Sequence, residues 1–217
     1  MPRRESRSSR RAVLGAAISL SRRGGLDSFS ISDLGEEIGV SKSCIYQHFE
    51  SRSELLAEAV LTYAEALSAD VIKAAAQAPK GLRRLVRMLD VWLGDYVLRG
   101  GCLILRAGSE LAGRAENAVS LSVAQAVTTW RGLLALQLKD AAHVGEINPS
   151  VDVQHLVFEV FSFALGVQHD HLFLGYPVEF RHSVLRGIFG RHGIEVPVEA
   201  SHRVLPSGAL RHAQTTY

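Results

Sequence analysis

The chain has 217 residues, of which 47% are hydrophobic, so it can bury one large core or two smaller ones. Its 24 basic and 22 acidic side chains give a net charge of +2, and overall charge therefore does not identify a nucleic-acid-binding protein. The two cysteines match no metal or redox spacing and suit a reducing compartment. No apolar run reaches the roughly 18 residues of a membrane span, and no signal-peptide core is present. We expect a cytoplasmic protein without a membrane partner.

The N-terminus carries a local excess of positive charge. Its basic residues are Arg3, Arg4, Arg7, Arg10 and Arg11, against the single acidic residue Glu5. Such a segment is either a solvated tail or a basic arm that contacts phosphates or enters a minor groove. The residues that follow, 10–23, repeat apolar side chains at helical spacing and are ended by Gly24 and Gly25.

A short, well-capped helix is predicted next. Ser30 and Asp33 have the spacing of a capping box, in which the hydroxyl and the carboxylate satisfy early backbone N–H groups. The helix should continue to about Ile38, because Gly39 suits the left-handed conformation of a C-cap. Val40 should fill the space between this helix and the next.

A second helix follows at once. Ser41 is a suitable N-cap for a helix from Lys42 to about Phe49. Ser51 and Glu54 have the spacing of another capping box, which begins the next helix. Two helices joined by a short turn that contains glycine form the arrangement that places the second helix in the major groove of DNA.

These residues resemble the DNA-binding domain of TetR-type transcriptional repressors. The positions that agree lie within about the first 65 residues: Phe29-Ser30-Ile31, Asp33-Leu34, Gly39-Val40-Ser41, Ile45-Tyr46, His48-Phe49, Arg52 and Leu55-Leu56. The sequence departs from the family where Gly35 replaces the usual alanine, Arg52 the usual lysine, and Ser21 a common aromatic residue. Relative to alanine, Gly35 is expected to weaken the first helix by up to ~1 kcal/mol.

The expected DNA contacts divide into base-reading and phosphate-binding side chains. The exposed residues near the start of the second helix should face bases, and they are Lys42, Ser43, Cys44 and Gln47. The resemblance implies that Tyr46 and His48 contact phosphates. Ser30, Ser41 and Arg52 lie at or beside helix N-termini, where N–H groups attract phosphate, and we include them in the DNA-binding set.

Beyond residue 51 the hydrophobic pattern predicts helices rather than strands. The expected helices span 55 to past 71, 82–98, 102–112, 116–143, 151–174 with Ser150 as N-cap, and 178–191. We therefore expect an all-α fold. It comprises a three-helix, DNA-binding helix-turn-helix domain over 1–50, a helical ligand-binding and dimerisation domain over 51–193 whose first helix bridges the two, and a loosely ordered tail over 194–217.

The predicted helix 151–174 is apolar nearly all round, so more than one of its faces must be buried. It is either the central helix of a monomeric bundle or half of an interface with a second copy. The last helix, 178–191, adds a further apolar stripe. The resemblance implies a homodimer through these two helices, which would present two reading helices to a near-palindromic operator in double-stranded DNA.

The resemblance also implies that a small-molecule effector binds among the C-terminal helices, with no cofactor. Aromatic residues at helical spacing are usually core residues, but such cavities are mostly apolar with a few polar groups. The candidate lining residues are Trp92, Tyr96, Cys102, Arg106, Trp130, Phe161 and His169.

Metal binding and catalysis find little support. His169 and His171 are two residues apart on a helix and point in different directions, so they do not readily share an ion. Ser109 and Ser120 have no paired base and no nucleophile elbow. We expect no metal site and no enzyme activity.

The sequence thus predicts a sequence-specific DNA-binding transcriptional regulator, a ligand-responsive repressor that acts as a homodimer. Two alternatives stay open. An architectural DNA-binding protein without a ligand would have a solidly filled C-terminal domain. A helical ligand carrier or enzyme with a vestigial helix-turn-helix would lack the steep salt dependence of a phosphate-binding protein.

Overall fold

The computed structural model describes residues 9–177 and 180–196, whose regular secondary structure is entirely helical. The elements are α2 (Arg10–Gly24), α3 (Ile31–Ile38), α4 (Lys42–Tyr46), α5 (Arg52–Ala75), α6 (Leu82–Val91), the π-helical turn η1 (Trp92–Val97), α7 (Leu103–Leu111), α8 (Ala118–His143), α9 (Val153–Leu172) and α10 (Arg181–Arg191). The all-α fold class is confirmed. Within these residues no helix combines the length and the apolar character needed to cross a bilayer.

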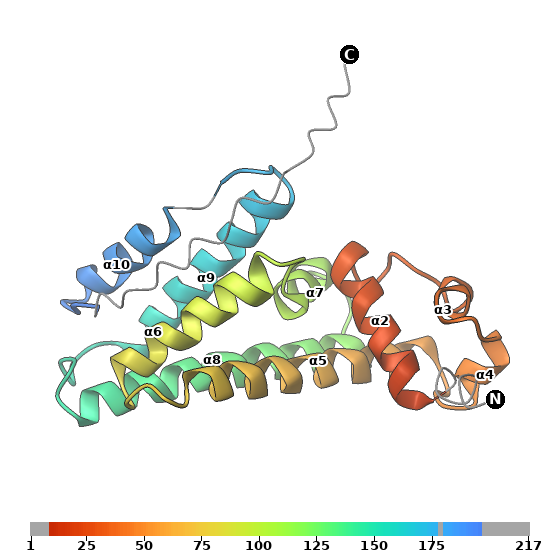
Figure 1. Ribbon diagram of the computed structural model, residues 1–217, viewed down its shortest axis with the longest axis horizontal. Helices are drawn as coiled ribbons and strands as arrows, with labels where there is room; N and C mark the ends of the chain where they lie inside the picture. Colours follow the sequence, from red (N-terminus) through yellow and green to blue (C-terminus); the bar gives the residue numbers. More distant parts are fainter. Residues whose placement is uncertain (1–8, 178–179, 197–217) are drawn as a thin grey trace, which may run out of the picture.

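The helices form a small group at one end and a longer body behind it (Figure 1). α2, α3 and α4 make up the small group. α5 leaves it and runs side by side with α8, its most extensive neighbour, while α6 and α9 pack on the same body and α10 packs on α9. α5 therefore connects the two parts of the molecule as one continuous helix.

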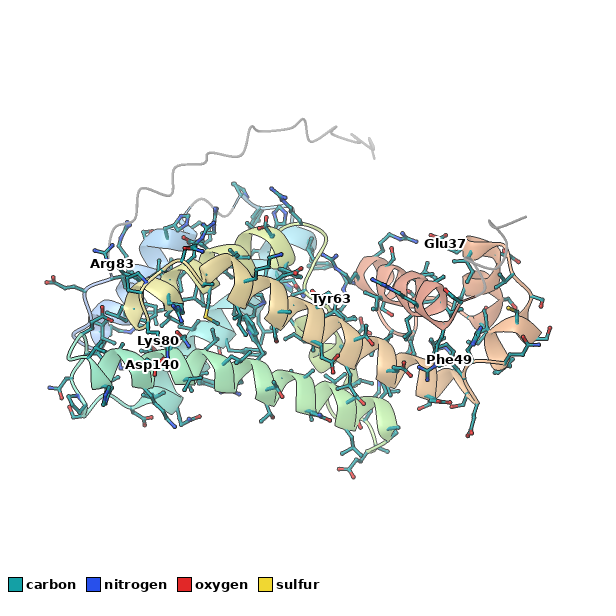
Figure 2. The ribbon with its side chains drawn as sticks, turned by 60° about the horizontal axis from the view of Figure 1, so that its bottom comes forward. Glu37, Phe49, Tyr63, Lys80, Arg83 and Asp140 are labelled. Atoms are coloured by element: carbon teal, nitrogen blue, oxygen red, sulfur yellow. The ribbon has the colours of Figure 1, made fainter. Side chains whose placement is uncertain are left out.

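One buried core extends through both parts because α5 contributes to each. Near its start, Leu55 and Val60 are completely buried, and Phe49 beside them is 1% exposed. Further along, Tyr63 and Leu67 are buried in the body. Figure 2 shows Phe49 in the N-terminal group and Tyr63 farther along α5.

Both ends of α3 are capped as predicted. Ser30 Oγ accepts from the Asp33 N–H at 3.3 Å, and the Asp33 carboxylate accepts from the Ser30 N–H at 2.8 Å. Gly39 ends α3 with φ +71°, the left-handed conformation that glycine adopts at low cost. The capping box predicted at Ser51 forms only in part. Ser51 Oγ accepts from the Glu54 N–H, but the Glu54 carboxylate binds the N–H of Glu50, not that of Ser51.

Several boundaries differ from the prediction. α4 ends at Tyr46, not near Phe49, because the chain tightens there and the His48 N–H donates to the Ile45 carbonyl three residues back. The N-cap of α9 is Asp152, not Ser150. Asp152 accepts from two N–H groups of the first turn at 3.0 Å, whereas Ser150 is bound by the Asn148 side chain in a local turn.

The predicted helix 82–98 is divided. α6 ends at Val91, and η1 follows, in which the Leu98 N–H bonds the Leu93 carbonyl five residues back. Trp92 and Leu93 are both buried there. The last helix begins at Arg181, while 178–179 lie outside the described residues. Of the predicted tail, 197–217 lie outside them too, and Ile194 is buried.

Candidate nucleic-acid interface

The turn between α3 and α4 is built by a close backbone approach. The Val40 N–H donates to the Gly35 carbonyl at 2.9 Å, and a Cβ on Gly35 would lie 2.6 Å from the Val40 carbonyl oxygen. Glycine at position 35 thus allows the chain to fold back against α3. The side chains of Ile45 and Phe49 point into the domain as predicted, with exposed fractions of 0% and 1%, and they hold α4 against the core.

With α4 anchored, its polar side chains face outward. Ser41, Lys42, Ser43 and Gln47 are exposed, and Tyr46 is 49% exposed although it is aromatic. Cys44 and His48 are only partly exposed. The structure therefore presents most of the predicted base-reading side chains on one accessible surface.

A groove of about 620 Å³ lies between the start of α3 and α4. Its lining unites Ser30, Lys42, Tyr46 and Arg52, four of the predicted DNA-contacting residues, with Asp33 and the loop before α3. The other predicted DNA-contacting residues, Ser41, Ser43, Cys44, Gln47 and His48, lie outside this lining. The groove thus combines the basic and hydroxyl groups of a phosphate-binding surface with two carboxylates, those of Asp27 and Asp33.

The polar groups at the start of α3 are already paired within the protein. The N–H groups of Ser32 and Asp33 both donate to Ser30 Oγ. The backbone hydrogen bond from Ser30 holds the pKa of Asp33 below its ordinary value, so this carboxylate is ionised at neutral pH. In the groove lining, Lys42 and Tyr46 carry exposed side chains, whereas these two amides of α3 are already paired.

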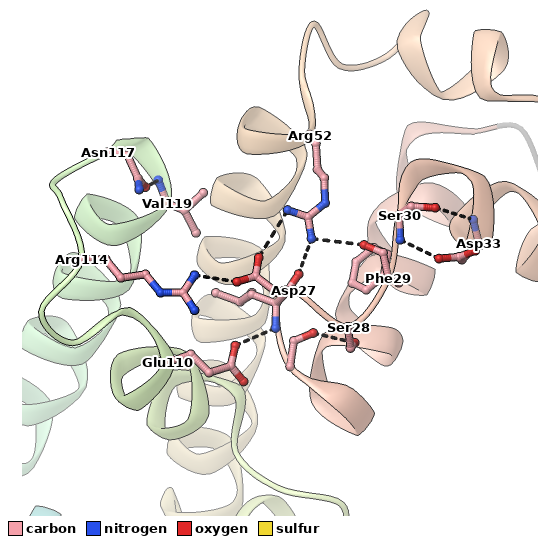
Figure 3. Close-up of polar contacts among 12 residues, drawn as sticks. Asp27, Ser28, Phe29, Ser30, Asp33, Arg52, Glu110, Arg114, Asn117 and Val119 are labelled. Atoms are coloured by element: carbon pink, nitrogen blue, oxygen red, sulfur yellow. Dashed lines mark hydrogen bonds and ion pairs between the residues drawn. The ribbon is translucent and has the colours of Figure 1, made fainter.

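Arg52 has a role that the sequence did not predict. Its Nη2 donates to the carbonyls of Leu26 at 2.5 Å and Phe29 at 3.1 Å, and its Nη1 lies 3.6 Å from Asp27. Arg52 therefore holds the loop that precedes α3. Figure 3 shows that Arg114, just beyond α7, meets Asp27 from the other side. No local motif marks these partners, because they are far apart in the chain.

One arginine of the N-terminal cluster, Arg10, makes contacts within the domain. Arg10 pairs with Glu58 and Glu54 of α5, and its guanidinium lies 4.6 Å from the centre of the Phe49 ring. Arg11 is exposed. The predicted arm residues Arg3, Arg4 and Arg7 lie outside the described residues.

Four of the seven predicted ligand-lining residues come together in the C-terminal body. The Trp92 ring centre lies 5.0 Å from that of Trp130 and 6.1 Å from that of Phe161, and Trp92 Nε1 donates to Cys102 Sγ at 3.5 Å. All four side chains are at most 9% exposed. Burial raises the pKa of the Cys102 thiol, which disfavours its reactive thiolate form.

The other three candidates have different partners. The Tyr96 hydroxyl donates to Asp70 at 2.6 Å, and Tyr96 lines a second groove of about 600 Å³ with Arg22, Lys73 and Asp95. His169 is exposed and contacts Asp170, and Arg106 is half-buried. His171 binds the Leu98 carbonyl, away from His169. Within the described part of the chain no group of three candidate ligand side chains could hold a metal ion.

One buried polar group in the aromatic cluster, the indole N–H of Trp130, lacks a hydrogen-bond partner among the described residues. An unsatisfied buried donor costs about 1–3 kcal/mol, so a bound polar atom would stabilise this group. Gln168, by contrast, is buried and paired, because its side-chain oxygen accepts from the Cys102 N–H at 2.6 Å.

Two family models match the chain. Residues 13–59 match the model described as bacterial regulatory proteins of the tetR family, and residues 81–184 match a tetracyclin repressor-like C-terminal domain. The protein belongs to the TetR family of transcriptional regulators. The helix-turn-helix of α3 and α4 is accordingly the DNA-binding element of a transcriptional regulator, and the family resemblance seen in the sequence is confirmed.

Solved structures of this family share the fold. A TetR-family regulator from Agrobacterium tumefaciens has a TM-score of 0.73 at 19% identity, with 87% of this chain and 98% of that one covered. A TetR regulator from Chloroflexus aurantiacus gives 0.74 at 24% identity, with 91% and 100% covered. FadR from Bacillus subtilis, in complex with stearoyl-CoA, gives 0.63 at 15% identity, with 81% and 95% covered. No curated protein sequence matches the chain.

Proposed function

We propose that this TetR-family protein is a homodimeric repressor that binds a near-palindromic operator and releases it when a small molecule binds its C-terminal domain. The observation that carries DNA binding is the surface of α4. Its polar side chains are exposed above the buried anchors Ile45 and Phe49, beside a groove that unites Lys42 and Tyr46 with Ser30. Lys42 and Gln47 are suited to hydrogen bonds with guanine and adenine, respectively.

Dimerisation through α9 and α10 is supported by apolar side chains left uncovered on these helices. Phe158 on α9 is 57% exposed, and Val184 on α10 is 39% exposed. A second copy related by a two-fold axis would cover both and place two α4 helices on the same side of one DNA duplex.

An effector site in the body is supported by the aromatic cluster around Trp92. The cluster is apolar, and the buried Trp130 supplies an unpaired N–H that could orient a ligand. The stearoyl-CoA bound to the FadR structure shows that one protein of this fold holds a ligand with a long apolar chain. A ligand that favours a different separation of the reading helices would lower operator affinity by its difference in affinity for the two states.

The direct packing of Trp92 against Trp130 and Phe161 favours a second candidate function. A core filled by these side chains is what an architectural DNA-binding protein without an effector requires. Such a protein would bend or bridge DNA with little sequence preference.

A binding selection on genomic fragments, with the full-length protein at two salt concentrations, tests these proposals. A repressor should enrich one or a few near-palindromic sites and lose affinity steeply as salt rises. Uniform binding to all fragments would favour the architectural role. Absence of binding at both salt concentrations would overturn DNA recognition by α4.

A further inference from the structure

The loop between α2 and α3, residues 25–30, is held by side chains from two directions (Figure 3). From α7, Glu110 Oε2 accepts from the Leu26 N–H at 2.8 Å. From α5, Arg52 donates to the Leu26 carbonyl at 2.5 Å and to the Phe29 carbonyl at 3.1 Å. Both backbone groups of Leu26 are thus bound by side chains of other helices.

Gly25 permits this close approach. Its φ of +105° is a conformation that residues with a side chain rarely adopt, and a Cβ there would lie 2.2 Å from a Glu110 carboxylate oxygen. The α7 carboxylate can therefore rest directly against the loop backbone. The contact between Glu110 and the Leu26 N–H therefore depends on the backbone conformation of the loop.

Asp27 joins the two sides. Its Oδ2 accepts from Arg114 at 2.5 Å, and its Oδ1 lies 3.6 Å from Arg52 Nη1. The Arg114 hydrogen bond, helped by the charge of Arg52, holds the pKa of Asp27 below its ordinary value. Asp27 and Arg114 are each more than half exposed, so the pair contributes little to folding stability. Its effect is on where the loop lies.

The position of this loop bears directly on the DNA-facing groove. Asp27 and Phe29 line that groove themselves, and Ser30, which follows at once, caps α3. A shift of residues 26–29 would therefore change the part of the groove lining that faces Lys42 and Tyr46. Arg114 belongs to the α7–α8 connection, which is part of the C-terminal body.

We propose that Asp27 and Arg114 are positioning residues for DNA binding. The ion-pair chain Arg114–Asp27–Arg52 lets the α7–α8 connection set the position of the groove at the start of α3. The inference rests on the proposed function, because it takes this groove to bind phosphates. These ion pairs add to the other links between the two parts of the molecule, which are the continuous helix α5, the Glu110–Leu26 hydrogen bond and the hydrogen bonds of Arg22 to the carbonyls of Arg99 and Gly101. Since Arg114 and Asp27 are both exposed, their ion pair can break and re-form without opening the core.

The first test needs no DNA. Hydrogen exchange of the free, full-length protein is compared among the wild type, Arg114→Gln, Asp27→Asn and the control Arg99→Gln, whose arginine pairs with Asp95 inside the body at similar exposure. Amides of residues 26–34 should exchange about two- to tenfold faster in the first two variants and unchanged in the control. The double variant should exchange no faster than Asp27→Asn. Unchanged loop exchange in both single variants would overturn the proposal.

The second test measures operator affinity, using the site found by the binding selection. Arg114→Gln should weaken binding about two- to tenfold, and Arg114→Lys should restore most of the loss. The slope of log K against log salt should stay the same, whereas a lost phosphate contact would reduce it by about 0.9. A reduced slope would make Arg114 a direct DNA contact and overturn the positioning role.

The two tests distinguish a failure of the proposed DNA-binding function from a failure of the positioning role. If the wild type binds no operator, the proposed DNA-binding function fails, while loop exchange still decides whether the ion-pair chain holds the start of α3. If loop exchange rises in Arg114→Gln but operator affinity is unchanged, the chain holds the loop without positioning the DNA interface, and the proposal is overturned on that point.

Discussion

Gln47 and Tyr46 are neighbours at the end of α4, and both are exposed, but their side chains suit different parts of DNA. An amide can pair with an adenine edge, whereas a phenol hydroxyl is suited to a phosphate. Gln47→Ala should therefore relax preference at one base position by about 1–3 kcal/mol. Affinities for a set of single-base operator variants measure this change.

Tyr46→Phe serves as the matched comparison. It removes one hydroxyl from the groove lining and should weaken binding to all operator variants by a similar factor, because a phosphate contact carries no sequence information. An unchanged ranking of operator variants in Gln47→Ala would refute the base-reading role of that residue.

Glu159 gives a prediction about pH. The hydrogen bond from His192, at 3.0 Å, and the nearby Arg191 hold the pKa of this α9 carboxylate below its ordinary value of 4.5. The resulting stability is fully present above that ordinary pKa and is lost as pH falls through the lowered one. Glu159→Gln should lower the free energy of unfolding by up to about 1 kcal/mol at pH 7, and the difference from wild type should shrink as pH falls below 4.5. Urea unfolding at a series of pH values measures it, and a difference that grows as pH falls below 4.5 would contradict the assignment.

At the scale of residues, the sequence predicted what is local. The Ser30–Asp33 capping box was predictable because its partners are three residues apart. The engagement of Arg52 was not, because its partners are backbone carbonyls 23 and 26 residues earlier in the chain. Arg114 and Asp27 are 87 residues apart, and no spacing rule connects them. The buried aromatic cluster was predicted only in part. Its members were proposed as individual lining residues, but the contacts among them were not predicted.

Two glycines at helix positions should respond oppositely to alanine. Gly15 in α2 is exposed, and no neighbouring atom lies within 4 Å of the position that an alanine methyl would occupy there. Gly15→Ala should therefore stabilise the protein by up to about 1 kcal/mol. Gly35 in α3 would place its methyl 2.6 Å from the Val40 carbonyl oxygen, which belongs to the turn of the helix-turn-helix.

Gly35→Ala should therefore destabilise the protein despite the better helix propensity of alanine, by about 1–3 kcal/mol, the typical cost of overpacking. Thermal unfolding of both variants against wild type checks this pair. The expectation from the sequence alone, that Gly35 merely weakens α3, leaves out the close approach of the Val40 carbonyl. A rise in melting temperature for Gly35→Ala would show that the turn can shift at little cost.

The helices themselves were largely predictable from apolar periodicity, and their ends less so. The π-helical turn η1 was not predicted. It differs from an α-helix by only one residue per hydrogen-bonded turn, so the spacing of Trp92, Leu93 and Val97 is also compatible with an α-helix. The start of α9 was misplaced because Ser150 and Asp152 are both good caps. The Asn148 side chain bound Ser150 and left Asp152 to cap the helix.

The dimer is a prediction about the whole molecule. Phe158 is exposed on α9, with the guanidinium of Arg131 5.9 Å from its ring centre. Phe158→Arg would bring like charges together within the proposed interface, so the protein should sediment as a monomer and bind its operator far more weakly. Leu121→Arg, on the similarly exposed Leu121 of α8, should remain dimeric. Sedimentation velocity distinguishes the two, and a dimeric Phe158→Arg would place the interface elsewhere.

The continuous helix α5 also limits how such proteins can be recombined. The family model for the N-terminal part extends to residue 59, which takes in the first two turns of α5. Leu55 and Leu56 there are buried in the N-terminal part of the core with Phe49, whereas Tyr63 and Leu67 are buried in the part of the same core that lies in the body. A chimera cut at residue 50 would separate the reading helices from the residues that support them. An exchange of DNA specificity between two relatives should therefore carry the beginning of α5 with the incoming segment and leave the remainder with the recipient.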